Sequence, residues 1–162
     1  MNKKCEEFTN LDELTVELGK LGQVSPLPSL NEYETYLDLN ERIIYIDFDI
    51  DDTLIEYSRR IIRWNRQDKD IPIEERKPIK VLVNSYGGSL DACLHFIDTL
   101  LLSKTPVYTY NVGVAMSAGF YIMLAGSQRF AYPNAQFLIH SGSGGAAGTY
   151  EQSKSQMEHY TR

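Results

Sequence analysis

Residues 106–119 read PVYTYNVGVAMSAG, an apolar run that passes directly into a serine flanked by small residues. The first part, Pro106 to Val112, is rich in β-branched and aromatic residues and predicts a strand. A helix is predicted to begin at Ser117 and to continue through Ala125. Small neighbours allow a sharp strand-to-helix turn, which leaves a hydroxyl and nearby backbone N–H groups open to a substrate carbonyl. Ser117 is therefore a candidate nucleophile.

The rest of the chain alternates predicted strands and helices. Strands are predicted at residues 42–48, 79–84, 129–132 and 136–140, and helices from Asp51 or Asp52 to Trp64, at residues 90–104 and from residue 150 onward. The helix at 90–104 is expected to bury one apolar face, formed by Leu90, Cys93, Leu94, Ile97 and Leu101. This order predicts a layered α/β fold with parallel strands.

Two regions are expected along the chain. Residues 1–32 are predicted to form a polar N-terminal extension, in which Pro26 and Pro28 indicate a linker. Residues 33–162 are predicted to form a single domain, with regular structure beginning near Glu41.

Composition excludes several classes of protein. A formal net charge of -6 argues against a nucleic-acid-binding surface, which requires clustered lysine and arginine. Cys5 and Cys93 fit neither a disulfide framework nor a metal-binding spacing, and they indicate a reducing, cytoplasmic setting. The N-terminus has no apolar signal-peptide core and no stretch has the length of a membrane span. We therefore expect neither secretion nor membrane insertion.

A second motif, NSYGGS at residues 84–89, also follows a predicted strand and precedes a helix. Its glycines expose backbone N–H groups, and His140 ends the last predicted strand. Because the carboxyl ends of parallel strands meet at one edge of a sheet, this motif, Ser117 and His140 are expected to converge. The alternatives are that Ser117 only packs within its helix and that His140 only hydrogen-bonds a turn.

Jointly, these motifs resemble those of the ClpP family, the proteolytic subunits of the ATP-dependent Clp protease, over residues 33–162. The matching segments are residues 33–36, 41–44, 84–89, 113–126, 132–134 and 139–140. The resemblance implies a crotonase-like superhelix of ββα units. It also implies that Ser117 is the nucleophile, that His140 is the general base, and that the N–H groups of Gly88 and Ala118 form the oxyanion hole.

The resemblance carries further expectations about ligands and assembly. Four residues are expected to contact the substrate: Gly87, Ser89, Gly142 and Gly144. The implied substrate is unfolded polypeptide, cut inside a homo-oligomer of stacked rings that an AAA+ ATPase unfoldase feeds. Residues 144–149 and the helix after them resemble the start of the handle through which two rings stack. Neither a metal nor another cofactor is implied.

The chain also departs from the family pattern. Tyr86 replaces a usual proline, and Ala118 replaces a common methionine. The family's catalytic aspartate lies downstream of the handle helix, whereas this sequence ends at Arg162 within it. We therefore expect a C-terminally truncated chain, with weaker assembly and weaker reaction at the serine than a longer form.

Two other functions stay open. A non-catalytic ring subunit could retain the same fold without the chemistry. An acyl-CoA hydratase or isomerase of the crotonase superfold is the other, but those enzymes use carboxylates where this chain has Ser117 and His140. A serine endopeptidase fits these residues best.

Overall fold

The computed structural model describes residues 29–141, 149, 151 and 154–155. The chain divides into two compact units, Met1–Leu37 and Asp38–Arg162. The second unit holds the sheet and every candidate site residue that the structure describes. Within the part of the chain that the structure describes, no helix is both long enough and apolar enough to cross a membrane.

Helix α2 (Leu30–Glu41) shows that regular structure begins earlier than expected. The prediction of a start near Glu41 was wrong because Ser29 and Glu32 form a capping box. The Ser29 hydroxyl accepts from the Glu32 N–H at 3.3 Å, and the Glu32 carboxylate accepts from the Ser29 N–H at 2.7 Å. The Ser-x-x-Glu spacing that produces such a cap was already present in the sequence.

A parallel sheet forms the centre of the second unit, and it confirms the predicted α/β class. Among the described residues it has five strands: β1 (Ile43–Ile46), β2 (Ile79–Ser85), β3 (Val107–Met116), β4 (Gln128–Ala131) and β5 (Gln136–Leu138). The order is β1-β2-β3-β4, and β5 pairs with the second half of β3. Every pairing is parallel, so the carboxyl ends of neighbouring strands share one edge.

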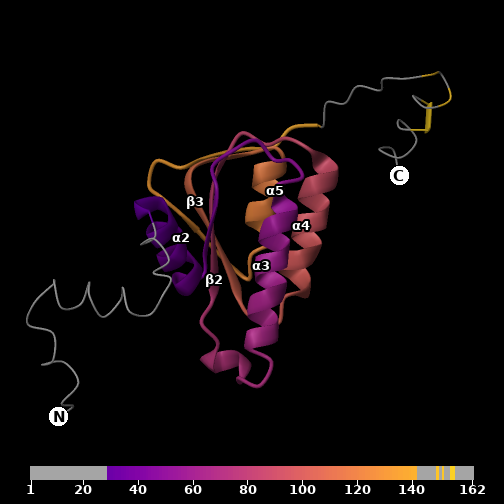
Figure 1. Cartoon of the computed structure of the whole chain (residues 1–162). Coiled ribbons are helices and arrows are strands. Elements are labelled where there is room, and N and C mark those ends of the chain that lie inside the picture. Colours follow the sequence, from indigo (N-terminus) through magenta and orange to yellow (C-terminus); the bar gives the residue numbers. More distant parts are fainter. Residues whose placement is uncertain (1–28, 142–148, 150, 152–153, 156–162) are drawn as a thin grey trace, which may run out of the picture. The chain divides into compact units, whose positions relative to one another are not determined.

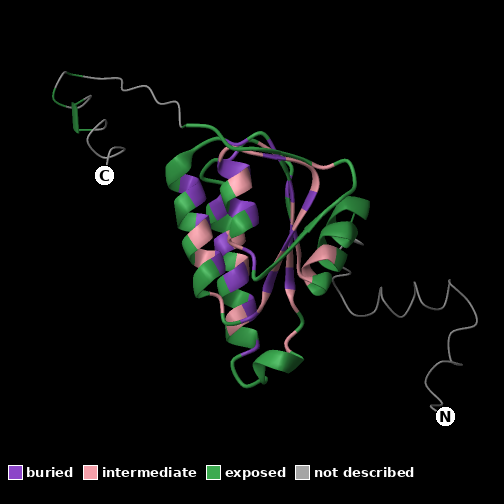
Figure 2. Ribbon diagram, turned by 180° about the vertical axis from the view of Figure 1, so that it is seen from behind, coloured by how far each residue is buried: buried purple, intermediate pink, exposed green. Residues whose placement is uncertain are grey.

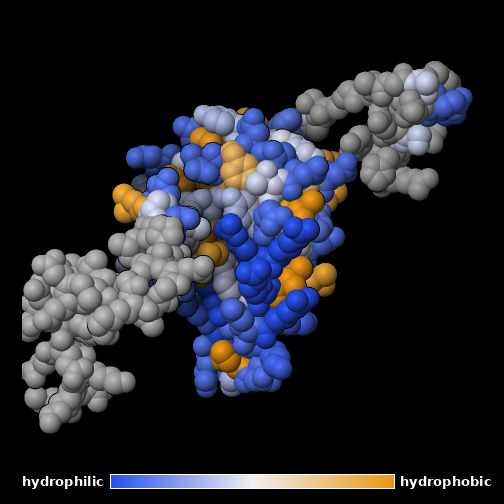
Figure 3. All heavy atoms as spheres, viewed as in Figure 1, coloured by the Kyte–Doolittle hydropathy of each residue, from blue (hydrophilic) through white to orange (hydrophobic). Residues whose placement is uncertain are grey.

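Three helices lie together on one face of this sheet (Figure 1). They are α3 (Leu54–Gln67), α4 (Leu90–Leu102) and α5 (Ala118–Leu124), and a short 3-10 helix, η1 (Ile73–Glu75), precedes β2. Figure 2 shows that the buried residues of these helices face the strands and one another. The outward residues of α3 include the exposed Arg59, Arg63 and Arg66, and the surface over this helix is mainly hydrophilic (Figure 3).

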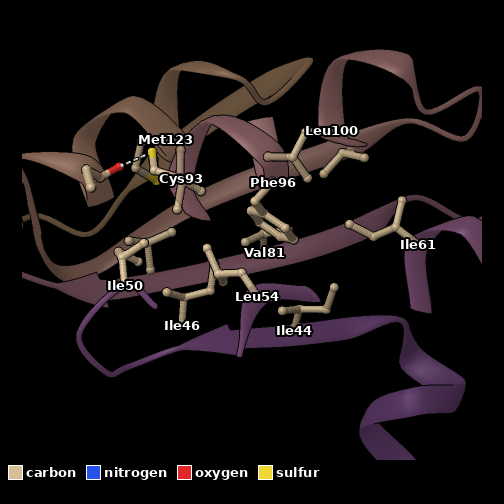
Figure 4. Packing of buried hydrophobic residues seen from close by; sticks show 14 of the residues in the cluster. Ile44, Ile46, Ile50, Leu54, Ile61, Val81, Cys93, Phe96, Leu100 and Met123 are labelled. Carbon is tan, nitrogen blue, oxygen red and sulfur yellow. Dashed lines mark hydrogen bonds between the residues drawn. The ribbon is translucent and has the colours of Figure 1, made fainter. Parts of the chain in front are cut away.

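The hydrophobic core fills the space between the helices and the sheet (Figure 4). Ile44, Ile46, Val81 and Phe96 are among its fully buried side chains. β-branched residues are frequent in β1 and β2 because a strand covered by helices has an apolar face toward the core.

Helix α4 buries a different face from the one predicted. Cys93 is buried and Ile97 packs partly buried against the core, as expected, but Leu90, Leu94 and Leu101 are exposed. The other buried positions are Ala92, Phe96 and Leu100. Apolar residues surround most of this helix, so their spacing fitted two adjacent faces equally well. Packing against α3 and α5 selected the face.

Strand β3 is longer than the predicted 106–112 and continues to Met116. Its last residues, Val114–Met116, pair with β5, and the Val114 N–H also donates to Asn84 Oδ1 at 3.2 Å. These partners lie far away in the sequence, and they extend β3 past Gly113. The composition of residues 113–116 alone did not predict a strand there. The helix predicted from residue 150 lies mostly outside the described residues.

A buried ion pair joins the start of β1 to the end of α3. Asp68 is 1% exposed, and its carboxylate accepts from Arg42 Nη2 at 2.7 Å and from Thr105 Oγ1 at 2.7 Å. The hydrogen bond from Arg42 holds the pKa of the Asp68 carboxyl below its ordinary value, and that from Thr105 adds to the effect. The pair links three segments at the edge of the sheet opposite to Ser117.

Replacing Asp68 by Asn should lower the free energy of unfolding at pH 7 by about 3 kcal/mol, because the largely buried Arg42 would lose its counter-charge. Since the folded-state pKa lies below the unfolded value of about 3.9, this stabilisation is present above that value and is lost as the pH falls. Urea unfolding should therefore show the parent and the variant converging between about pH 5 and pH 2.

Asp70→Asn is the matched control, because the Asp70 side chain is 85% exposed and lies two residues away. It should stay within about 0.5 kcal/mol of the parent at every pH. A gap between Asp68→Asn and the parent that did not change with pH would contradict the assigned ion pair.

Candidate active site

Ser117 occupies the turn between β3 and α5, as predicted, and its backbone is left-handed. Its φ and ψ are 51° and -122°. Among the described residues, only Arg42 and Ser117 have positive φ without being glycine. A left-handed non-glycine residue costs roughly 1–3 kcal/mol and persists only where its surroundings fix it. Here the Ser117 N–H donates to the Leu138 carbonyl at 2.9 Å, and the Ser117 carbonyl accepts from the Phe120 N–H at 3.0 Å.

The glycine turn after β2 lies directly against Ser117. A Cβ added to Gly87 would be 2.7 Å from the Ser117 Cβ and 3.2 Å from the Ala118 nitrogen. Gly87 and Gly88 have φ of 114° and 146°, a backbone that side chains rarely adopt. The predicted convergence of these two motifs is therefore found in the structure.

A third segment, the one that follows β1, meets the same turn. Ile50 N–H donates to the Gly87 carbonyl at 2.7 Å, and the Ile50 carbonyl accepts from the Ser89 N–H at 2.7 Å. A Cβ on Gly88 would lie 2.3 Å from the Ile50 oxygen. Ile50 was not a candidate in the sequence, because its role depends on backbone atoms that any residue carries.

Two backbone donors at this edge have no acceptor among the described residues: the N–H groups of Gly88 and Ala118. The Ala118 N–H is at the first position of α5, where a helix offers it no partner. The Gly88 N–H has no such acceptor because the hydrogen bonds of the bridge to Ile50 are made by the Gly87 carbonyl and the Ser89 N–H. Both donors are suited to a developing negative charge on oxygen.

The buried Ser85 hydroxyl holds the glycine turn in place, a role that the sequence analysis missed. The residue is 1% exposed, and its hydroxyl donates to the Phe48 carbonyl at 2.6 Å and accepts from the Gly87 N–H at 3.2 Å. Gly119 packs against it, since a Cβ there would lie 3.1 Å from the Ser85 carbonyl oxygen. Ser85 therefore connects the turn that contacts Ser117 with the first turn of α5.

Cys93 holds the start of α5 from the core side. Its thiol donates to the Ala118 carbonyl at 3.2 Å, as the dashed line in Figure 4 shows. Burial raises the pKa of this thiol to about 11, so it stays protonated and unreactive at neutral pH. The contact makes Cys93 a structural neighbour of the site and not a nucleophile.

His140 lies just beyond β5, next to the strand that ends at Ser117. Met116 of β3 pairs with Leu138 of β5, so the two strands end at the same edge of the sheet. His140 is exposed, and its Nδ1 lies 2.7 Å from the Ser141 carbonyl oxygen. A carbonyl only accepts, so Nδ1 carries the proton in this contact, and in the neutral ring Nε2 is then the acceptor. Within the described residues, no hydrogen bond joins His140 to Ser117.

The other predicted substrate contacts divide into two groups. Ser89 caps α4, because its hydroxyl accepts from the Ala92 N–H at 3.3 Å. Gly142 and Gly144 lie outside the described residues. In the described part of the chain, no group of three or more His, Cys, Asp or Glu side chains is arranged to hold a metal ion.

Residues 30–162 match the family model described as Clp protease. The chain is 35% identical over 122 residues to the ATP-dependent Clp protease proteolytic subunit 3 of Streptomyces avermitilis, an alignment that covers 74% of this chain and 53% of the relative. It is 30% identical over 141 residues to proteolytic subunit 2 of Mycolicibacterium paratuberculosis, covering 84% of this chain and 68% of the relative. The chain spans about half the length of the Streptomyces relatives.

Replacing Ser85 by Ala should slow labelling of Ser117 by a fluorophosphonate by about tenfold or more, because the Gly87 N–H and the Phe48 carbonyl lose their partner. The matched control is Ser58→Ala, which removes another buried serine hydroxyl, one that accepts from Thr99 on α4 at 3.2 Å. Both variants should lose about 1 kcal/mol of stability. Equal labelling rates in the two variants would show that Ser85 is not connected to the site.

Proposed function

The chain belongs to the Clp protease family, and on this premise we propose that it is a serine-type endopeptidase subunit that hydrolyses unfolded polypeptide. The observation that carries this proposal is the left-handed Ser117 at the carboxyl edge of the sheet, with Gly87 packed against it. Such a turn presents a hydroxyl beside free backbone donors, which acyl transfer requires. The names of the relatives support the same activity.

In the proposed reaction, Ser117 Oγ attacks the peptide carbonyl carbon while His140 Nε2 removes the hydroxyl proton. The N–H groups of Gly88 and Ala118 receive the negative charge on the carbonyl oxygen. The C–N bond then breaks, and His140 returns the proton to the leaving amine. His140 then removes a proton from a water molecule, which attacks the acyl-serine carbonyl carbon. The bond to Ser117 Oγ breaks, His140 returns the proton to Oγ, and a carboxyl product leaves.

The contact of His140 with Ser141 supports the role of base. With the proton on Nδ1, the lone pair of Nε2 is available, which is the tautomer that a serine hydrolase needs. A carboxylate in place of this carbonyl would set the same tautomer and would also stabilise the imidazolium that forms; its loss costs about 10⁴-fold in turnover in serine proteases, chiefly through the wrong tautomer. We infer that the Ser141 carbonyl sets the tautomer of His140, and that another group stabilises the charge of the imidazolium.

Further copies of this chain and an ATPase are the proposed partners. Leu101 and Leu102 of α4 and Ile139 beyond β5 are more than half exposed, and large apolar side chains of this kind favour burial in an assembly. The relatives are named as proteolytic subunits of an ATP-dependent protease, which supports both partners. Cys93, a free and buried thiol, supports the proposed cytoplasmic setting.

Replacing Ser117 by Ala should lower hydrolysis of an unstructured peptide by at least about 10³-fold, because no nucleophile remains. Stability should not fall, since alanine keeps the backbone and removes a hydroxyl with no side-chain cap bond. Ser127→Ala is the control: its hydroxyl donates to the Val107 carbonyl at 2.8 Å, at the other end of β3. A peptidase rate in Ser117→Ala equal to that in Ser127→Ala would refute the assignment of Ser117 as the nucleophile, and a parent that hydrolyses no peptide would favour a non-catalytic subunit.

A further inference from the structure

Asn111 lies at the point where β3 changes its partner. On one edge, β3 pairs with β4 through residues 108–111 and with β5 through residues 114–116. Between these two ladders, residues 112 and 113 pair with neither of the two strands. Main-chain pairing alone therefore leaves a gap beside Asn111.

The side chain of Asn111 fills this gap with two hydrogen bonds. Asn111 is fully buried, its Nδ2 donates to the Gln136 carbonyl at 2.8 Å, and its Oδ1 accepts from the Gly113 N–H at 3.1 Å. Its own carbonyl accepts from the Tyr132 N–H at 2.9 Å. One residue thus connects the end of β4, the start of β5 and the glycine in β3.

Burial does little to hold β5 in place. All of its residues are exposed, and Phe137 and Leu138 remain 49% and 44% exposed. An edge contact between the rings of Phe120 and Phe137 adds a limited apolar contribution. The position of β5 therefore depends mainly on its hydrogen bonds: the ladder with β3, the Ser117 N–H to Leu138, and the Asn111 amide to Gln136.

We propose that Asn111 is a positioning residue for the reaction at Ser117, acting through β5 on His140. The proposal rests on the proposed function, because it assigns Asn111 no contact with the reacting atoms. Asn111 holds the first residue of β5, and His140 follows four residues later. Proton transfer requires a hydrogen-bond distance of about 2.6–3.2 Å, so a small displacement of β5 is enough to slow it.

The test is Asn111→Asp, which keeps the shape and the acceptor toward Gly113 but replaces the donor toward Gln136 by an oxygen. We expect the rate constant of Ser117 labelling by a saturating peptidyl phosphonate to fall by roughly 10²-fold, the scale of a displacement of about 1 Å. The half-saturating probe concentration should stay the same, because Asn111 does not bind the probe. Reversible partial unfolding would lower the rate constant only in proportion to the folded fraction, which circular dichroism measures.

Asn65→Asp is the matched control at the opposite end of β3. The Asn65 amide also donates with Nδ2, to Ser103 Oγ at 2.9 Å, and accepts with Oδ1, from the Thr105 N–H at 3.0 Å. It should leave the labelling rate constant within about threefold of the parent. Asn111→Ser, which shortens the side chain without adding a buried charge, is the second variant and should slow labelling in the same way.

Amide hydrogen exchange gives a readout that does not depend on activity. In Asn111→Asp, the Ser117 N–H that donates to Leu138 should exchange faster, and in Asn65→Asp it should not. Labelling within threefold of the parent in both Asn111 variants would overturn the proposal. A parent whose Ser117 is never labelled would instead overturn the proposed function and the positioning role with it, while exchange would still report whether Asn111 holds β5.

Discussion

Gly87 and Ser117 approach so closely that no side chain fits between their backbones. A Cβ on Gly87 would lie 2.7 Å from that of Ser117, well inside van der Waals contact. This contact fixes the turn after β2 against the turn after β3. Glycine adopts the positive φ of the first turn without strain, whereas the positive φ of Ser117 must be stabilised by neighbours. The hydrogen bond to Leu138 holds Ser117, and those of Ser85 and Ile50 hold the glycine turn. The same arrangement leaves the N–H groups of Gly88 and Ala118 without an acceptor among the described residues.

The opposite edge of the sheet is fixed by buried polar side chains. The carboxylate of Asp68 connects Arg42 with Thr105, and Asn65 accepts from the N–H groups of Lys104 and Thr105. These bonds set where β1 and β3 begin. Ser117 and the glycine turn lie at the other end of the sheet, where they are held by their own hydrogen bonds.

The two sides of the site are held by different physical means. The side of Ser117 and Gly87 rests on the core, since Ala118 and Cys93 are buried and α5 packs on β2 and β3. The side of His140 rests on an exposed strand whose position depends on hydrogen bonds. Hydrogen bonds to water compete with those in an exposed strand, so this side is the one that contacts to further chains would stabilise most.

Much of the fold and part of the site could be predicted from local sequence patterns. The parallel α/β class and the Ser117 junction were correct, because apolar periodicity and small residues at a turn act over a few positions. The start of α2 could also have been predicted, since Ser29 and Glu32 are three residues apart. The buried face of α4 could not, because its apolar residues fitted two faces and packing chose between them.

The sequence by itself determined which residues are the candidates for the chemistry: a serine at a strand-to-helix turn, two adjacent glycines and a histidine after a strand. Only the tertiary structure decided what holds them. Ser85, Ile50 and Asn111 act through backbone atoms far away in the sequence, such as the carbonyls of Phe48, Gly87 and Gln136. Backbone carbonyls are the same at every residue, so no residue pattern marks those partners before the strands are aligned.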